Sequence, residues 1–471
     1  MKNPPSTARF YIMQSTNSKF SPPTRQAIAS KFLACSLVTA ISLLCFSGSA
    51  SRLQAAVDNR NFPTHPAIKA NVDFWEKIYS TYSTSQAVIH DRNDLTKVYG
   101  VIPIINYMLP GAQQLNKPAI DRAKQHYSAI LIRLAQGVPP TSRDERHVAA
   151  LFQGAGSSQL IRASESIRTQ IGQKERFREG VVRSGAYLTE IRRIFRSHNL
   201  PEELAYLPHV ESSFNPDAYS KAGASGLWQF TRSTGKTYMR IDDLIDERQD
   251  PIIASHAAAK FLKRNHSLLD SWPLALTAYN YGTSGMMRAK KAKGSYEMIF
   301  LEYQEGYFKF ASRNFYPSFL AALRVAQRFE QEPSLSRHKP TPTTIVRLSN
   351  PASLNTVSRN FNVNITTLKT LNPAIQAPVF QGGQQLPRGY QLKIPATGRN
   401  QTQHVTIEAD QKLRKSRNAN INIIKAPHPA AKASPFKGDQ QVLPAITANV
   451  KQQTIIIQAN QKPRKNRTYL Q

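Results

Sequence analysis

The chain has 471 residues, more than one hydrophobic core usually organises, so we expect two or three folded units. Its 62 Lys and Arg residues against 30 Asp and Glu residues give a formal net charge of +32, which predicts attraction to polyanions such as nucleic acid, anionic lipid or an acidic cell-wall polymer. Both cysteines, Cys35 and Cys45, lie in the first 50 residues, so the rest of the chain holds no thiol for disulfides, cysteine catalysis or metal binding.

Residues 1–50 have the layout of a secretory signal peptide. An apolar stretch at 32–46 is followed by small residues and preceded by three basic ones, Lys19, Arg25 and Lys31. The stretch is shorter than the roughly 20 residues that cross a bilayer, so we favour export over a permanent anchor and rank a lipid on Cys45 below plain cleavage. Export predicts a periplasmic or envelope-associated protein, with membrane attachment left open, and disfavours nucleic acid as a partner.

Residues 60–184 are predicted to form a helical N-terminal region. Strand signals are scarce, and apolar side chains recur at helical spacing, as in Ile68, Val72, Trp75 and Tyr79 and again in Ile120, Ala123, Tyr127, Ile130 and Leu134. Core packing is the preferred interpretation of both faces.

The helical pattern continues through residues 185–330. One helix that ends near Asn199 is predicted from the spacing of Val181, Gly185, Leu188, Ile191 and Phe195. Pro201 then begins the next helix at a first-turn position. Further helix starts are predicted where Asp250 precedes Pro251 and where Ser271 precedes Trp272.

A Pro-rich linker at 331–342 leads to a small second unit at 343–396. This unit shows a β-branched strand at 343–348, two amphipathic helices at 354–361 and 365–371, and a closing strand at 390–394. The order predicts a βααβ module.

Residues 397–471 are basic, of low complexity and poor in large apolar side chains, so we expect a disordered tail. The β-prone tetrads at 404–407 and 454–457 each precede a basic cluster. We favour a solvated tail over a dedicated binding element, and we expect it to attract the anionic surface of the cell envelope.

One carboxylate stands out between residues 202 and 282. Glu211 lies near the C-terminal end of a predicted helix, where the helix dipole disfavours an anion, and its neighbours Val210 and Phe214 are apolar. Both effects raise a carboxyl pKa, which suits a group that donates a proton near neutral pH. In isolation a solvent-facing glutamate would be the simpler interpretation.

Three motifs follow one another in this region: Glu211-Ser212-Ser213-Phe214-Asn215-Pro216, Ala224-Ser225-Gly226-Leu227-Trp228-Gln229-Phe230 and Ala278-Tyr279-Asn280-Tyr281-Gly282. In this order they resemble the catalytic domain of the soluble-lytic-transglycosylase family, glycoside hydrolase family 23. The resemblance is strong over 185–325, weaker over 70–180 and absent from the tail. Trp228 and the upstream helical segment are similar to a membrane-bound branch of the family.

The resemblance implies a lysozyme-like helical fold that binds the glycan strands of peptidoglycan. Members of the family break the β-1,4 bond after N-acetylmuramic acid without water and leave a 1,6-anhydro end, and a single glutamate acts as acid and then as base. The motif match assigns both roles to Glu211. Most glycoside hydrolases use two carboxylates, and the motifs here contain one. A hydrolytic muramidase and a non-catalytic peptidoglycan-binding protein stay open as alternatives.

Polar side chains of the motifs are expected to contact substrate, namely Ser212, Gln229, Tyr279 and Asn280. Many relatives carry a further Tyr in a motif like Asn-Tyr-Val-Pro, and the corresponding stretch here is Asn314-Phe315-Tyr316-Pro317. Because Phe315 has no hydroxyl, we add Tyr316 as a candidate. For Trp228 and Tyr281, core packing and sugar stacking both stay open.

The unit at 343–396 resembles a LysM module, which binds glycans that contain N-acetylglucosamine. Positions that fit are Val363, Leu368, Asn372-Pro373 and residues 391–395. The usual Gly-Asp-Thr-Leu is replaced by Asn350-Pro351-Ala352-Ser353-Leu354, so a purely structural module stays open.

We expect no cofactor and no metal, because no His, Asp or Glu cluster has metal-ligand spacing. His209 and His256 are expected to be structural. The oligomeric state does not follow from the sequence.

Overall fold

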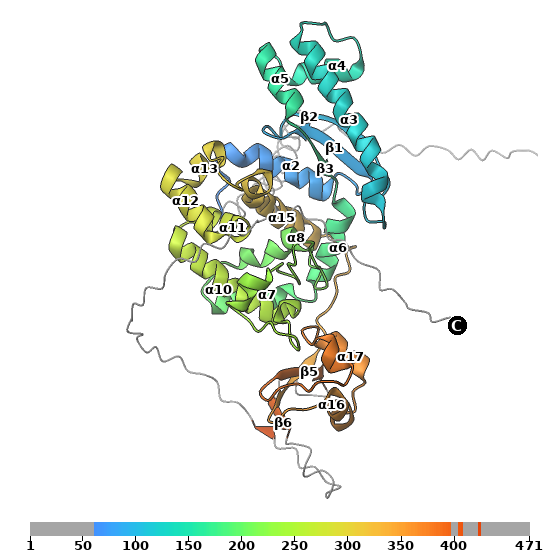
Figure 1. Cartoon of the computed structure of the whole chain (residues 1–471), viewed down its shortest axis with the longest axis vertical. Coiled ribbons are helices and arrows are strands. Elements are labelled where there is room, and N and C mark those ends of the chain that lie inside the picture. The colour runs from blue at the N-terminus through green and yellow to red at the C-terminus, as the bar shows by residue number, and fades with distance from the viewer. Residues whose placement is uncertain (1–60, 397–403, 408–422, 425–471) are drawn as a thin grey trace, which may run out of the picture. The chain divides into compact units, whose positions relative to one another are not determined.

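The computed structural model describes residues 61–396 and the strands β6 (His404–Ile407) and β7 (Ile423–Ile424) (Figure 1). The described part is mainly helical, as predicted. The signal-peptide prediction and most of the tail prediction fall outside the described residues. Among the residues described, no helix is both long and apolar enough to span a membrane.

The N-terminal region is only partly helical, so the prediction for 60–184 is corrected here. An antiparallel sheet in the order β2-β1-β3 is formed by β1 (Gln86–Asp91), β2 (Val98–Pro103) and β3 (Ile167–Ile171). Every residue of β1 after Gln86 is buried, so both of its faces are covered and its side chains do not alternate between buried and exposed. A short apolar run of this kind reveals no period, which is why the strand was not predicted.

The second predicted helical face lies on α3 (Ala112–Ala135), which packs against the sheet together with α4 (Arg143–Leu151) and α5 (Ser157–Glu165). Their shared core includes Tyr127 and Leu131 from α3, Val148 from α4 and Ile89 from β1. Core packing of this face is therefore confirmed.

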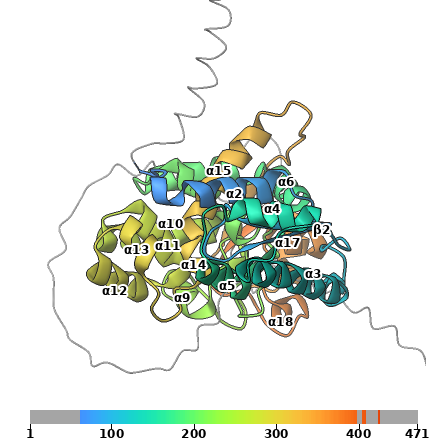
Figure 2. The ribbon, with the colours of Figure 1, turned by 90° about the horizontal axis from the view of Figure 1, so that it is seen from above.

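α2 (Lys69–Ser80) lies along α15 (Phe315–Glu330), although the two helices are far apart in sequence (Figures 1 and 2). The side-chain nitrogens of Asn71 and Trp75 donate to Asn314 Oδ1 at 2.8 and 3.2 Å. Glu76, the next residue along α2, accepts from Arg324 and Arg328 at 3.3 and 2.7 Å. The N-terminal region thereby forms part of the same body as the motif region.

The single helix predicted from Val181 to Asn199 is two helices, α6 (Lys174–Ser184) and α7 (Leu188–Ser197). The break lies where the linker crosses, since His338 N donates to Val182 O at 2.9 Å. A Cβ on Gly185 would lie 2.4 Å from His338 O, so only glycine fits there. The segment 331–342 is thus seated on α6 at this point rather than spanning free solvent.

The motif region continues through short and long helices: η2 (Glu202–Tyr206), α8 (Leu207–Glu211), α9 (Arg232–Lys236), η3 (Glu247–Gln249), α10 (Pro251–Leu269), α11 (Trp272–Tyr281), α12 (Thr283–Lys293), α13 (Tyr296–Glu302) and α14 (Phe310–Arg313). Two predicted helix starts are confirmed. Asp250 Oδ1 caps α10 by accepting from the Ile252 and Ile253 amides at 2.9 and 3.1 Å, and α11 begins directly after Ser271.

The small unit has the predicted β-α-α-β order, with one additional short helix: β4 (Thr343–Leu348), α16 (Leu354–Phe361), α17 (Ile365–Leu371), α18 (Ala377–Phe380) and β5 (Gln391–Pro395). β4 and β5 pair antiparallel. β6 pairs in parallel with β4 and β7 pairs with β6, so the tail is not wholly without structure, contrary to prediction. That the unit is a LysM module stays a prediction.

Candidate active site

Glu211 is the last residue of α8, a helix of 5 residues that ends in an unusual turn. Ser213 and Phe214 have φ of 53° and 52°, a left-handed conformation that costs free energy for residues with a Cβ. Arg183 of α6 holds this turn, because its Nε and Nη2 donate to Ser213 O at 3.2 and 2.8 Å. The hydrogen bonds from Arg183 therefore hold this strained turn, and with it the backbone of Glu211 at the end of α8.

The Glu211 side chain is partly exposed, yet burial of its carboxyl raises the pKa to about 8. Within residues 61–396 the carboxyl accepts no hydrogen bond and forms no ion pair, and no neighbouring charge adds to the shift. The predicted direction of the pKa shift is confirmed, with burial as its cause. A carboxyl of this kind is mostly protonated at pH 7 and is free to donate.

Tyr279 lies close to Glu211. Burial, and then the negative charge of Glu211, raise the pKa of Tyr279 well above its ordinary value. Its hydroxyl donates to Trp228 O at 2.8 Å. The structure therefore brings the first and third motifs together across the backbone of the second.

Trp228 and Tyr281 are core residues, which settles the alternative between packing and sugar stacking. Trp228 is completely buried, stacks on Phe195 with ring centroids 5.6 Å apart, and donates from Nε1 to Ser255 Oγ at 2.8 Å. Tyr281 is 8% exposed and packs edge-on against Phe308.

Two residues that were predicted to contact substrate donate side-chain hydrogen bonds to backbone carbonyl oxygens. Ser212 is buried, and its hydroxyl donates to Leu227 O at 2.8 Å, which ties the first motif to the second. Gln229 is half-buried, and its Nε2 donates to Gly226 O at 2.9 Å and Ala218 O at 3.2 Å. The Ser212 hydroxyl thus holds the turn after Glu211, and its contact with substrate stays a prediction.

Asn280 and Tyr316 differ in their placement. Asn280 is half-buried, and its Oδ1 accepts from Ser312 Oγ at 2.9 Å. Tyr316 is completely buried, donates to Pro63 O at 2.9 Å and packs edge-on against Tyr296. The Tyr316 hydroxyl is thus engaged by the N-terminal segment, and its role in place of a hydroxyl at Phe315 stays a prediction. Consecutive helical residues point about 100° apart, and that rotation turns Tyr316 towards the N-terminal segment.

Tyr79 of α2 was predicted only as a core residue, yet it belongs to the surroundings of Glu211. Its ring stacks on Phe177 with centroids 4.7 Å apart, and Phe177 stacks in turn on His209 of α8 at 5.0 Å. The pKa of Tyr79 is raised by burial, with a further contribution from the charge of Glu211. No spacing rule in the sequence connects α2 with α8, so only the fold reveals this neighbour.

The histidines near the site are structural. His209 is buried among the rings of Phe177, Tyr206 and Phe214, and burial lowers its pKa to about 3, so it is neutral. His256 lies 3.2 Å from His198. No group of three or more His, Cys, Asp or Glu residues that could hold a metal ion occurs in the described part of the chain.

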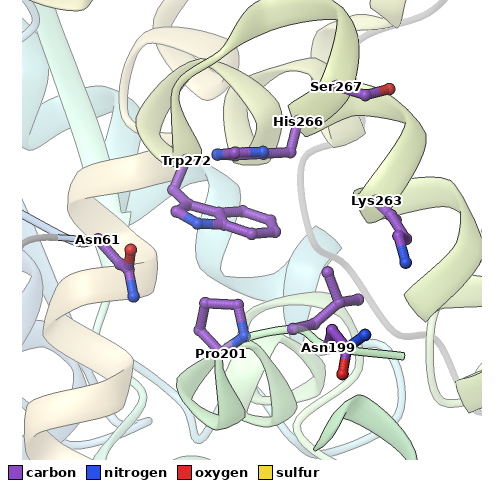
Figure 3. A pocket seen from close by; sticks show the side chains of 8 residues that line it. Asn61, Asn199, Pro201, Lys263, His266, Ser267 and Trp272 are labelled. Atoms are coloured by element: carbon purple, nitrogen blue, oxygen red, sulfur yellow. The ribbon is translucent and has the colours of Figure 1, made fainter. Parts of the chain in front are cut away.

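A separate pocket lies where α11 begins (Figure 3). Trp272 stacks there on His266 with ring centroids 4.1 Å apart, and Leu200, Pro201 and Lys263 line the same pocket. None of the predicted site residues lines this pocket, so it is distinct from the surroundings of Glu211.

The Arg248 guanidinium forms hydrogen bonds with the backbone of the second motif. Arg248 donates from Nε and Nη2 to the Asp246 carboxylate at 2.9 and 2.6 Å. Arg248 Nη1 donates to Gly223 O at 2.8 Å and to Phe230 O at 3.1 Å. Gly226 has a φ of 78°, and a Cβ there would lie 1.9 Å from Arg248 O. Gly226 is therefore required for its backbone conformation and its close approach to Arg248.

Residues 191–299, which span all three motifs, match the family model described as the Transglycosylase SLT domain. This part of the chain is a transglycosylase SLT domain. Over 231 residues the chain is 28% identical to membrane-bound lytic murein transglycosylase D of Escherichia coli (strain K12), covering 46% of this chain and 48% of that protein. The chain is thus a distant homologue of that protein.

A protein of Alteromonas sp. (strain M-1) that is named for tributyltin chloride resistance is 40% identical over 109 residues, covering 23% of this chain and 53% of that protein. The chain spans about half the length of the curated relatives it matches. A crystal structure of the lytic transglycosylase Slt from Pseudomonas aeruginosa is similar at a TM-score of 0.27 and 16% identity, covering 48% of this chain and 36% of that one, which is too slight for residue comparison.

Proposed function

We propose that this protein is a peptidoglycan lytic transglycosylase in which Glu211 acts first as acid and then as base. The SLT domain and the distant homology to a membrane-bound lytic murein transglycosylase support the class. The observation that carries the mechanism is the Glu211 carboxyl itself, which has no hydrogen-bond partner among the described residues and whose pKa is raised to about 8.

In the first step the protonated Glu211 carboxyl gives its proton to the glycosidic oxygen, and the bond between that oxygen and C1 of N-acetylmuramic acid breaks. The acetamide of the substrate stabilises the anomeric carbon, as the family resemblance implies. In the second step the Glu211 carboxylate takes the proton from the C6 hydroxyl, and O6 bonds to C1. The proton is returned to Glu211, and a pKa near the working pH suits a group that must both give and take it.

The hydrogen bonds within the protein determine which donors and acceptors of the other side chains remain for a sugar. Gln229 presents its Oε1 as an acceptor, because its Nε2 donates to backbone carbonyls. Asn280 presents its Nδ2 as a donor, because its Oδ1 accepts from Ser312. Tyr279 and Tyr79 lie close enough for the charge of Glu211 to raise their pKa, and Ser212 acts indirectly through its hydrogen bond to Leu227 O.

Hydrolysis by a muramidase is the second candidate. Most glycosidases place a second carboxylate across the scissile bond, about 5–10 Å away. Burial is the one cause of the raised pKa of Glu211, and no neighbouring carboxylate contributes to it. We therefore favour the non-hydrolytic route, with the acetamide of the substrate in place of a second carboxylate.

Digestion of purified glycan strands in oxygen-18-labelled water separates the two routes. A lytic transglycosylase produces anhydro ends that carry no label, because water does not enter the product. Labelled reducing ends at N-acetylmuramic acid would establish a muramidase instead. Unchanged strands, with binding retained, would point to a non-catalytic peptidoglycan-binding protein.

The setting that fits this activity is the cell envelope. The homology to a membrane-bound transglycosylase, the predicted export signal and the net charge of +32 all suit a protein that works on an anionic wall. We propose glycan binding for the LysM-like unit at 343–396 and envelope attraction for the basic tail.

A further inference from the structure

The small unit at 343–396 is joined to the SLT domain by backbone pairing as well as by the chain itself. Asp246 N donates to Ala374 O at 2.8 Å, and Gln376 N donates to Leu244 O at 2.8 Å. Between them Ile245 and Ile375 form an antiparallel β-bridge. The segment 240–250 of the catalytic region is thus paired with a strand-like stretch of the small unit.

An apolar side chain of the catalytic region also contributes to this contact. Ile245 is completely buried within the hydrophobic core of the small unit, next to residues such as Val346, Leu368 and Leu392. An apolar side chain that completes another unit's core is exposed to water if the two units separate, so its burial favours the docked arrangement.

A largely buried ion pair also links the small unit to the catalytic region. Lys393 Nζ of β5 lies 2.6 Å from Asp250 Oδ2, and the two side chains are 19% and 5% exposed. The other oxygen of Asp250 caps α10. A buried pair adds little net stability, but replacing one partner leaves the other as a poorly solvated charge without compensation, so the intact pair favours one relative position of the two units.

From this contact an unbroken chain of hydrogen bonds leads to the second motif. Asp246, whose amide is held by Ala374, binds Arg248 through both carboxylate oxygens. Arg248 in turn holds Gly223 O and Phe230 O, the backbone on either side of Gln229. The small unit therefore supports the backbone that presents Gln229 and the Trp228 carbonyl that Tyr279 binds.

We propose that the unit at 343–396 is a positioning element of the catalytic domain, which fixes segment 240–250 through the Ile245–Ile375 bridge and Lys393 and thereby holds the 224–230 motif. This role differs from that of a freely tethered glycan-binding module. Its catalytic consequence rests on the proposed function, while its structural consequence does not.

Hydrogen exchange in the full chain tests the structural consequence without any need for activity. The amides of Ser225, Gly226 and Gln229 donate to backbone carbonyls within and beside the motif. In Lys393→Met we expect these amides to exchange about five-fold faster, whereas Lys393→Arg, which keeps the charge, restores their protection. The matched control is Arg359→Met, an exposed basic residue on α16.

Turnover of a glycan fragment too short to bridge both units tests the catalytic consequence. We expect Lys393→Met to lower kcat about five-fold with little change in KM, and Arg359→Met to leave both unchanged. Unchanged exchange of the three amides in Lys393→Met would overturn the proposal, even if turnover fell. Faster exchange in a chain whose wild type releases no product would support the positioning role while refuting the proposed function. If Lys393→Met does not fold, Lys393→Gln takes its place in both measurements.

Discussion

Burial, and no neighbouring charge, sets the pKa of the Glu211 carboxyl near 8. The sequence was sufficient to single out this residue, because the helix end, the apolar neighbours and the motif are all local. The sequence was insufficient for Tyr79, which comes from a helix distant in the chain, and for the direction of Tyr316, whose hydroxyl donates to Pro63 O. Side-chain type is local information, whereas side-chain direction depends on packing.

Activity should fall as the pH rises through about 8. Because the folded pKa of Glu211 is raised, the protonated form needed for the first step is present below that pH and lost above it. The measurement is kcat/KM on glycan strands between pH 5 and 9 or so. An activity that rises steadily through pH 8 would contradict the assignment of Glu211 as the acid.

The same shift predicts a stability change in Glu211→Gln. Between the ordinary carboxyl pKa of 4.5 and about 8 the unfolded chain loses the Glu211 proton while the folded chain keeps it, so the wild type loses stability as pH rises through this window. Glutamine does not titrate, so we expect its Tm to exceed that of the wild type by a few degrees at pH 8 and to match it near pH 4. Glu305→Gln, at an exposed position, serves as the control in thermal unfolding. A Tm difference that does not depend on pH would contradict burial as the cause.

Tyr79→Phe should lower kcat about ten-fold and change the pH profile, because the substitution keeps the ring on Phe177 and removes the hydroxyl beside Glu211. Without that polar group the carboxylate is less well solvated, so the alkaline limb of the kcat profile should shift to higher pH. Tyr316→Phe is the matched control, since it removes a buried hydroxyl from the adjacent helix that donates to Pro63 O. Equal effects of the two substitutions would mean that Tyr79 acts through stability alone.

At the scale of elements, helices with polar caps were predictable, and strands buried on both faces were not. Asp250 and Pro251 indicate the start of α10 in the sequence, whereas β1 has no alternation of apolar and polar residues that would distinguish it from a helix. The break between α6 and α7 was also missed, because Gly185, the C-cap of α6, was counted as part of a continuous helical face, and its close approach to His338 O appears only in the fold.

Two glycines beside the second motif provide a test of how tightly it packs. Gly223 and Gly226 both have positive φ, so alanine costs about 1 kcal/mol at either position. At Gly226 the added Cβ would also lie 1.9 Å from Arg248 O, whereas at Gly223 the nearest atom is Tyr219 OH at 3.8 Å. We expect Gly226→Ala to destabilise the protein by roughly 2 kcal/mol more than Gly223→Ala in denaturant unfolding. Equal losses would show that Arg248 is not held against the motif.

At the scale of the whole molecule, the β-α-α-β order of the small unit and the mainly helical SLT region follow from the sequence pattern. Their docking does not, because Ile245 and Ile375 are ordinary apolar residues until the fold pairs them. The net charge of +32 belongs to this scale as well, because it acts over distances longer than any single contact.

Removal of residues 425–471, which leaves every described residue in place, should weaken binding to isolated sacculi and reduce its dependence on salt. The removed segment is rich in Lys and Arg, and attraction between exposed charges is screened over about 10 Å at 0.1 M salt. Co-sedimentation with sacculi across a salt series measures the effect. Binding and salt dependence that match the full chain would contradict a role of this segment in envelope attraction.

The most direct test of the central claim is mass spectrometry of the fragments released from sacculi by the wild type and by Glu211→Gln. We expect muropeptides with 1,6-anhydro ends from the wild type and none from the variant, whose amide neither donates nor accepts the proton that the two steps require. Reducing ends from the wild type, or anhydro ends from Glu211→Gln at the wild-type rate, would contradict the proposed role of Glu211.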